Sequence, residues 1–236
     1  MTTRCFVIVI RNHPASERYF KTILPSWTNI GWYLERFDAT TPDSLPSWPL
    51  NFDPDGCKQK AFTDRGFAKQ FTPTEKACWY SHYLLWKKCA EMNERILILE
   101  HDAMVVDPSL IKDRPDYDFW QVGTFLSAYF IAPELARWLC YKLEQGEKVI
   151  TLGALGFLHD FTKKHRKFVY LHPSGREWKT RWTENLHPIY YGVKQAYIPE
   201  VKNTINHWEG TAAEPYAEEF GRLFKYRPEL IIESDQ

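Results

Sequence analysis

Continuous apolar runs, not alternating ones, mark the predicted strands in the first half of the chain. Residues 6–10 read Phe-Val-Ile-Val-Ile, residues 95–99 read Arg-Ile-Leu-Ile-Leu, and residues 128–131 read Ala-Tyr-Phe-Ile. Runs of this kind are typical of strands covered on both faces, as in a parallel sheet flanked by helices. The first run is followed by the polar sequence Arg-Asn-His-Pro at residues 11–14, which predicts a loop.

Helical spacing of apolar residues separates these runs. Tyr19, Phe20 and Ile23 predict a helix over residues 16–24 that ends at Pro25. A second helix should begin after Thr72, which can cap it together with Glu75, and should run to about residue 92. One face of this helix should lie on the sheet. That face carries Cys78, His82, Leu85, Cys89 and Met92.

Further strands are predicted near residues 32–37 and 118–122, and a further helix over residues 133–143. Residues 42–71 lack sustained periodicity and predict a long loop. Beyond residue 151 the signals weaken to short segments at 168–171 and 196–198. The alternation of strands and helices predicts one α/β domain with a mostly parallel, Rossmann-like sheet, flanking helices and an irregular C-terminal third.

Composition places the chain among ordinary globular proteins. Its 236 residues hold 30 Lys+Arg and 30 Asp+Glu, with 44% hydrophobic residues, which excludes disordered and collagen-like chains. No apolar run approaches the ~20 residues that cross a bilayer, so a cytoplasmic protein without a transmembrane segment is expected. The 5 cysteines are widely spaced and odd in number, which argues against a disulfide framework or a zinc cage and favours reduced, mostly buried thiols.

The sequence Glu100-His101-Asp102 follows the predicted strand at residues 95–99. Ligands bind at the carboxyl ends of strands in doubly wound sheets. In an extended chain, two carboxylates two residues apart point the same way and suit a hard divalent cation. Acidic pairs at strand ends are also common as solvated turn residues, so this triplet alone leaves both interpretations open.

Two neighbouring segments resemble a known family signature. Residues 71–86 read Phe-Thr-Pro-Thr-Glu-Lys-Ala-Cys-Trp-Tyr-Ser-His-Tyr-Leu-Leu-Trp, and residues 95–103 read Arg-Ile-Leu-Ile-Leu-Glu-His-Asp-Ala. They resemble glycosyltransferase family 25, the lipopolysaccharide-type sugar transferases. The pattern of that family is Glu, a small residue, Ser-His, Leu-Trp and then an apolar strand running into Glu-Asp-Asp-Ala. Weaker similarities at residues 6–10, 37–39 and 127–131 extend the resemblance over about residues 5–140.

The resemblance implies a single GT-A-like domain over residues 1–236, with a donor-binding part at about 1–140 and an acceptor-side part at about 141–236. It implies a nucleotide-sugar donor, usually a UDP-sugar, and Mn²⁺ or Mg²⁺ as cofactor. Glu100 would lie at the ribose and metal, and Asp102 at the metal. The other donor contacts that it implies are Ile8, Asn12, Arg18, Asp38 and Ala39. For Arg18 a solvated helix charge, and for Asp38 a turn-capping role, remain open.

Ser81 is a further candidate for the donor site. His82 is expected to be a core histidine that is hydrogen-bonded to the backbone, with a catalytic role as the alternative. His207 is a candidate third metal ligand, because GT-A enzymes commonly return a C-terminal histidine to the metal, and an ordinary loop histidine is the alternative.

Two departures from the family pattern affect the expected chemistry. His101 stands where the family usually has Asp. The family tends to show Pro-Val-Asp after the later helix, but residues 149–154 contain no carboxylate. An inverting transferase needs a general base near the acceptor hydroxyl. Asp160 is the nearest replacement, with a capping or surface role as its alternative.

The acceptor is suggested by a basic stretch at residues 162–182, which holds seven Lys and Arg against a single Glu and interleaves them with aromatic rings. This composition suits a phosphate backbone with bases or sugars stacked beside it, or else a solvated face. The expected acceptor is therefore polyanionic, with hydroxylated DNA slightly favoured over phosphorylated lipopolysaccharide. The candidate acceptor residues are Lys163, Lys164, Arg166, Lys167, Arg176 and Trp178.

Two other classes compete with sugar transfer. A non-catalytic nucleotide-sugar or polyanion binding module of the same fold would account for His101 and for the missing carboxylate. A metal-dependent nuclease or phosphatase could use Glu100 and Asp102, but it usually needs further carboxylates to hold a second metal.

Overall fold

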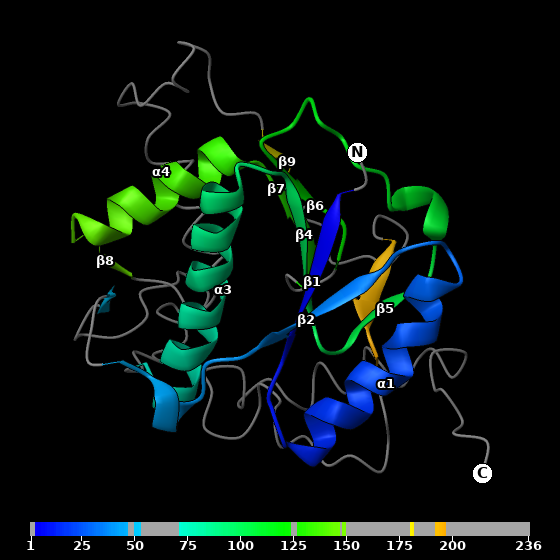
Figure 1. The fold of residues 1–236 in the computed structure, drawn as a ribbon, viewed down its shortest axis with the longest axis horizontal. Coiled ribbons are helices and arrows are strands. Elements are labelled where there is room, and N and C mark those ends of the chain that lie inside the picture. The colour runs from blue at the N-terminus through cyan, green and yellow to red at the C-terminus, as the bar shows by residue number, and fades with distance from the viewer. Residues whose placement is uncertain are drawn as a thin grey trace, which may run out of the picture.

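A six-stranded sheet forms the centre of the molecule (Figure 1). In this computed structural model the described residues are 3–46, 50–52, 71–123, 127–146, 148–149, 180–181 and 192–196. The strands follow the order β2 (Leu34–Asp38), β1 (Arg4–Val9), β4 (Ile96–Glu100), β7 (Ala128–Ile131), β6 (Phe119–Gln121) and β9 (Thr180–Arg181). Only β7 runs against the others among these strands. The predicted α/β fold class, with a mostly parallel sheet and flanking helices, is confirmed.

Helices cover both faces of this sheet. Phe6 and Ile8 pack in one core cluster with residues of α3 (Pro73–Met92) and α4 (Pro133–Glu144). Val7 and Val9 pack in the other cluster with residues of α1 (Pro14–Thr28). Because successive side chains of a strand point to opposite faces, a strand covered on both sides must be apolar throughout. This explains the continuous apolar run that opens the chain.

Helix α1 extends three residues beyond Pro25, where the sequence predicts its end. A proline removes one helical hydrogen bond, but the extension buries Trp27 completely. The indole Nε1–H of Trp27 donates to the carbonyl of Ala103 at 2.7 Å. The prediction was wrong because this contact lies outside the local sequence.

Helix α3 begins as predicted, with a capping box at its first turn. The Thr72 backbone N–H donates to Glu75 Oε2 at 2.8 Å, and the Glu75 N–H donates to Thr72 Oγ1 at 3.2 Å. The helix ends before Asn93, whose φ of 52° is left-handed. Three members of the predicted sheet-facing stripe, namely His82, Leu85 and Cys89, are buried.

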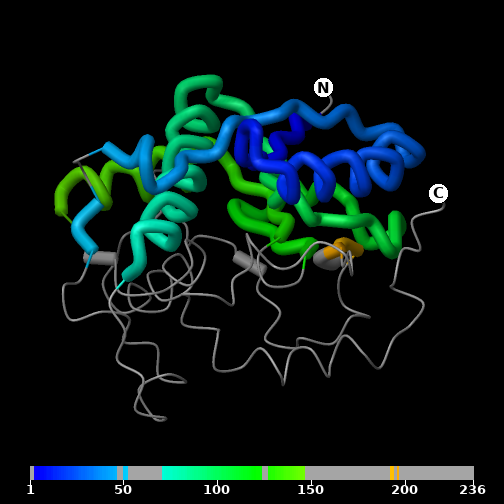
Figure 2. Tube along the Cα trace, turned by 90° about the horizontal axis from the view of Figure 1, so that it is seen from below, coloured from blue at the N-terminus to red at the C-terminus, as the bar shows by residue number. Residues whose placement is uncertain are grey.

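Shorter elements complete the described fold. Strand β5 (Ala103–Val105) pairs antiparallel with β10 (Val193–Gln195), and Figures 1 and 2 both show the orange β10 against β5. Strand β3 (Asn51–Phe52) pairs with β8 (Lys148–Val149), and two 3₁₀ turns cover Pro42–Ser44 and Pro108–Leu110. The predicted segment at 168–171 lies outside the described residues, as does most of the C-terminal third.

No helix among the described residues combines the length and the apolar character that a bilayer crossing requires. The cytoplasmic location expected from the sequence stays a prediction.

Candidate functional site

The candidate donor-site residues meet at the carboxyl edge of three parallel strands. Ile8 of β1 lies opposite Glu100 of β4, and Val9 lies opposite Asp38 of β2. Strands β2 and β4 flank β1 on opposite sides, so the chain reverses its order across the sheet at β1. Such a switch point opens a crevice at the carboxyl ends of the strands, where α/β proteins bind ligands.

Glu100 is the last residue of β4, and Asp102 lies in the turn that follows it. Glu100 ends β4, its N–H donates to the Ser127 carbonyl at 2.8 Å, and its side chain is 17% exposed. The chain turns at His101 and Asp102. The extended backbone that would point the Glu100 and Asp102 carboxylates the same way is therefore not present. Both turn residues are buried, and the carbonyl of Asp102 accepts the N–H of Ala196 at 2.6 Å. The segment after β10 therefore contacts this turn directly.

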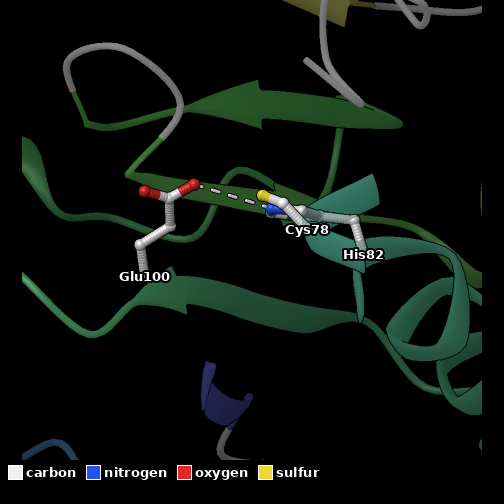
Figure 3. A group of neighbouring side chains, drawn as sticks. All are labelled: Cys78, His82 and Glu100. Carbon is white, nitrogen blue, oxygen red and sulfur yellow. Dashed lines mark ion pairs between the residues drawn. The ribbon is translucent and has the colours of Figure 1, made fainter. Parts of the chain in front are cut away.

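His82 joins a buried polar network beside Glu100. Its Nδ1 lies 2.8 Å from the Tyr129 hydroxyl, which also accepts the Trp86 Nε1–H at 3.0 Å. Its Nε2 faces Glu100 Oε1 at 3.7 Å (Figure 3). The expected burial of His82 is confirmed, but its partner is a side chain, not backbone. Sequence reasoning missed Tyr129 as a site residue, although it placed the residue on a predicted strand.

Cys78 completes a group with His82 and Glu100, and their ligand atoms all lie within 4.8 Å of one another. Cys78 is exposed as a residue although protein atoms surround its sulfur, which corrects its predicted burial, whereas Cys5, Cys89 and Cys140 are buried as expected. Cys57 lies outside the described residues. Desolvation by the surrounding protein and then the negative charges of Glu100, Glu75 and Asp102 raise the pKa of the Cys78 thiol.

Ser81 connects α3 to the end of β2. Its Oγ accepts the Thr40 N–H at 2.9 Å and donates to the Ala77 carbonyl at 3.0 Å. The side chain is buried, and these bonds hold the chain after Asp38 against the helix. The described contacts of Ser81 therefore join α3 to the chain that follows β2.

An ion-pair network surrounds Asp38 at the other side of the edge. Arg11 Nη2 lies 3.0 Å and Arg36 Nε 3.2 Å from the carboxylate, while Arg36 Nη2 also reaches Glu17 at 2.6 Å. The hydrogen bond from Arg36 lowers the pKa of Glu17. Sequence reasoning did not single out these partners, because only the β1–β2 pairing brings them together.

The remaining donor candidates lie close to this network. Asn12 is exposed and has a left-handed φ of 58°, Arg18 is exposed on α1, and the Ala39 N–H donates to the Val9 carbonyl at 2.9 Å.

The donor atoms at β4 fit the divalent cation that the resemblance implies. Carboxylate oxygens are the ligands that Mg²⁺ and Mn²⁺ prefer. Glu100 ends β4 and Asp102 follows it in the next turn, so two carboxylates lie close together along the chain, and a cation bound by both would offset their charge.

Several predicted site residues lie outside the described part of the chain: Asp160, Lys163, Lys164, Arg166, Lys167, Arg176, Trp178 and His207. The predictions for them stay untested.

Comparison with known proteins gives one family match. The sequence model of the family described as "Glycosyltransferase family 25 (LPS biosynthesis protein)" matches residues 6–149. Among solved structures, a similar chain is a glycosyltransferase involved in the glycosylation of the major capsid of PBCV-1. Its TM-score is 0.40 at 11% identity, with 82% of this chain and 93% of that chain covered. No curated protein matches the chain.

Proposed function

The chain belongs to glycosyltransferase family 25, and we propose that it transfers a sugar from a UDP-sugar to a hydroxyl group of a polyanionic acceptor. Membership of this family makes the chain a sugar transferase, in place of the binding module or nuclease that the sequence alone left open. The observation that carries the proposed donor site is the meeting of β1, β2 and β4 at a switch point, with two carboxylates at the end of β4.

Different residues at this edge would contact different parts of a bound nucleoside diphosphate. Asp102 and Glu100 would hold Mn²⁺ or Mg²⁺, and Glu100 would also reach the ribose. When bound, the cation supplies positive charge against the charge that develops on the departing diphosphate. Ile8, Asn12 and Arg18 would contact the base and ribose.

Two neighbours keep this edge in position. His82 Nε2 lies 3.7 Å from Glu100 Oε1, so this carboxylate faces α3. Arg11 and Arg36 hold Asp38 at the rim through their ion pairs.

For the acceptor, the description of the family as lipopolysaccharide biosynthesis proteins supports a phosphorylated saccharide. A hydroxylated DNA base would satisfy the same requirement for a polyanion, and the basic stretch at residues 162–182 is the feature that would bind either one. Asp160 is the proposed general base on the acceptor side.

Titration calorimetry with UDP, with and without Mn²⁺, tests the donor site. Asp102→Asn should abolish both Mn²⁺-dependent UDP binding and transfer, and Glu100→Gln should weaken UDP binding less. Asp116→Asn is the matched control, because Asp116 forms an exposed ion pair with Arg114 at 3.3 Å and should bind UDP as the wild type does. Unchanged Mn²⁺-dependent binding in Asp102→Asn would remove the metal assignment, and a larger loss in Glu100→Gln would reverse the two roles.

A further inference from the structure

A mixed set of metal-binding atoms lies beside the proposed donor site. Cys78 and His82 are four residues apart on α3 and therefore face the same side of the helix, toward Glu100 at the end of β4. Figure 3 shows the Cys78 sulfur beside the imidazole nitrogen from which the dashed line runs to the Glu100 carboxylate. We propose that Cys78, His82 and Glu100 form a zinc-binding site with a fourth position open to water.

The donor types distinguish this site from one for Mn²⁺ or Mg²⁺. Zinc binds Cys sulfur, His nitrogen and carboxylate oxygen together, whereas the harder cations prefer oxygen alone. Three protein ligands with a fourth open position are a common arrangement for zinc. The sequence argues against a cage of several cysteines, but this site needs only one.

The separations suit a tetrahedral centre after a small adjustment. Ligand atoms at ~2.0–2.3 Å from zinc in tetrahedral geometry lie roughly 3.3–3.8 Å apart. The His82 Nε2 to Glu100 Oε1 distance of 3.7 Å already falls in that range, and all ligand atoms lie within 4.8 Å of one another. The ligand atoms must therefore approach one another by at most about 1 Å, and rotation of the Cys78 side chain can move its sulfur that far.

His82 has a hydrogen-bond partner at the ring nitrogen that does not face the cluster, as is usual for zinc-binding histidines. Its Nδ1 lies 2.8 Å from the Tyr129 hydroxyl, whose oxygen also accepts from Trp86. When Nδ1–H donates to that oxygen, the lone pair of Nε2 is left facing the cluster. The ring needs no rearrangement to bind a metal.

The local charge favours a dication. Glu100 brings a carboxylate into the group itself, and Asp102 follows it two residues later in the chain. A bound Zn²⁺ would offset this charge and take the place of the thiol proton, which leaves to solvent. Exposure of Cys78 also provides a path by which the ion can enter.

Cobalt provides a direct test on the full-length chain, after removal of metal with a chelator and dialysis. Co²⁺ bound to a thiolate gives a charge-transfer absorption in the near ultraviolet, and Zn²⁺ should abolish it by displacement. Cys78→Ser should lose this absorption, whereas the matched control Cys140→Ala, which removes a buried thiol from α4, should retain it. Cys78 is exposed, so its variant should fold, and far-ultraviolet circular dichroism checks this.

Zinc affinity, measured by competition with a chromophoric chelator, gives the second readout. Cys78→Ser should bind Zn²⁺ at least about tenfold more weakly, and Tyr129→Phe about 10–100-fold more weakly through the loss of ring support. A wild-type protein without the cobalt absorption, or a Cys78→Ser variant with wild-type zinc affinity, would overturn the site. The zinc site shares Glu100 with the proposed donor metal, but these readouts need no sugar or nucleotide, so a failed zinc test is distinguishable from a failed test of Mn²⁺-dependent UDP binding.

Discussion

Removing the Tyr129 hydroxyl should destabilise the fold more than its size suggests. The hydroxyl lies 2.8 Å from His82 Nδ1 and accepts from Trp86 Nε1 at 3.0 Å, and all three side chains are buried. Tyr129→Phe would leave one polar atom of His82 and one of Trp86 without a partner and out of reach of water. Each orphaned buried group costs about 1–3 kcal/mol, so the total for the two groups should be about 2–6 kcal/mol. That is a large part of the ~5–15 kcal/mol that stabilises a typical domain.

Tyr83→Phe is the matched control. The Tyr83 hydroxyl donates to Glu144 Oε1 at 2.7 Å, but the Glu144 side chain is 38% exposed and can be rehydrated. This variant should lose only about 0.5–1.5 kcal/mol.

Urea denaturation of both variants, followed by circular dichroism, measures the difference. With a slope of ~2–3 kcal/mol/M, the urea midpoint for Tyr129→Phe should fall by roughly 0.7–3 M. Equal losses in the two variants, at unchanged slope, would show that the buried network contributes nothing beyond an ordinary surface hydrogen bond.

Two further predictions concern the acceptor and alkaline pH. Replacing four basic residues by Gln should weaken binding to hydroxymethylated duplex DNA and reduce its logarithmic salt slope by ~0.9 for each phosphate that is no longer neutralised, with UDP affinity unchanged. The four are Lys163, Lys164, Arg166 and Lys167. Equal filter binding by wild type and variant, or no binding by either, would leave lipopolysaccharide as the acceptor. Burial raises the pKa of Cys89 and of Cys140 from 9.0 to about 12, so the folded state holds these protons more tightly than the unfolded state. The free energy of unfolding should therefore fall as pH rises from about 9 toward 12, and flat urea midpoints over that range would contradict this.

Features of the chain that depend on near neighbours were readable from the sequence. The capping box at Thr72 and Glu75 joins residues three apart, and the apolar run of β1 reflects a strand covered on both faces. The family signature likewise lies in two short segments, so Glu100 and Asp102 could be proposed as site residues before their surroundings were known.

Contacts between distant residues could be found only in the tertiary structure. Helix α1 continues beyond Pro25 because Trp27 is buried there and hydrogen-bonds to the Ala103 carbonyl. The Tyr129 hydroxyl contacts His82, which is 47 residues away in the sequence. The exposure of Cys78 also differs from what its place in the helical pattern predicts, and only the tertiary structure brings its sulfur near His82 and Glu100. Periodicity reports which face of an element is buried, whereas strand order and register decide which side chains meet. The grouping of Cys78, His82 and Glu100 depends on that second kind of information.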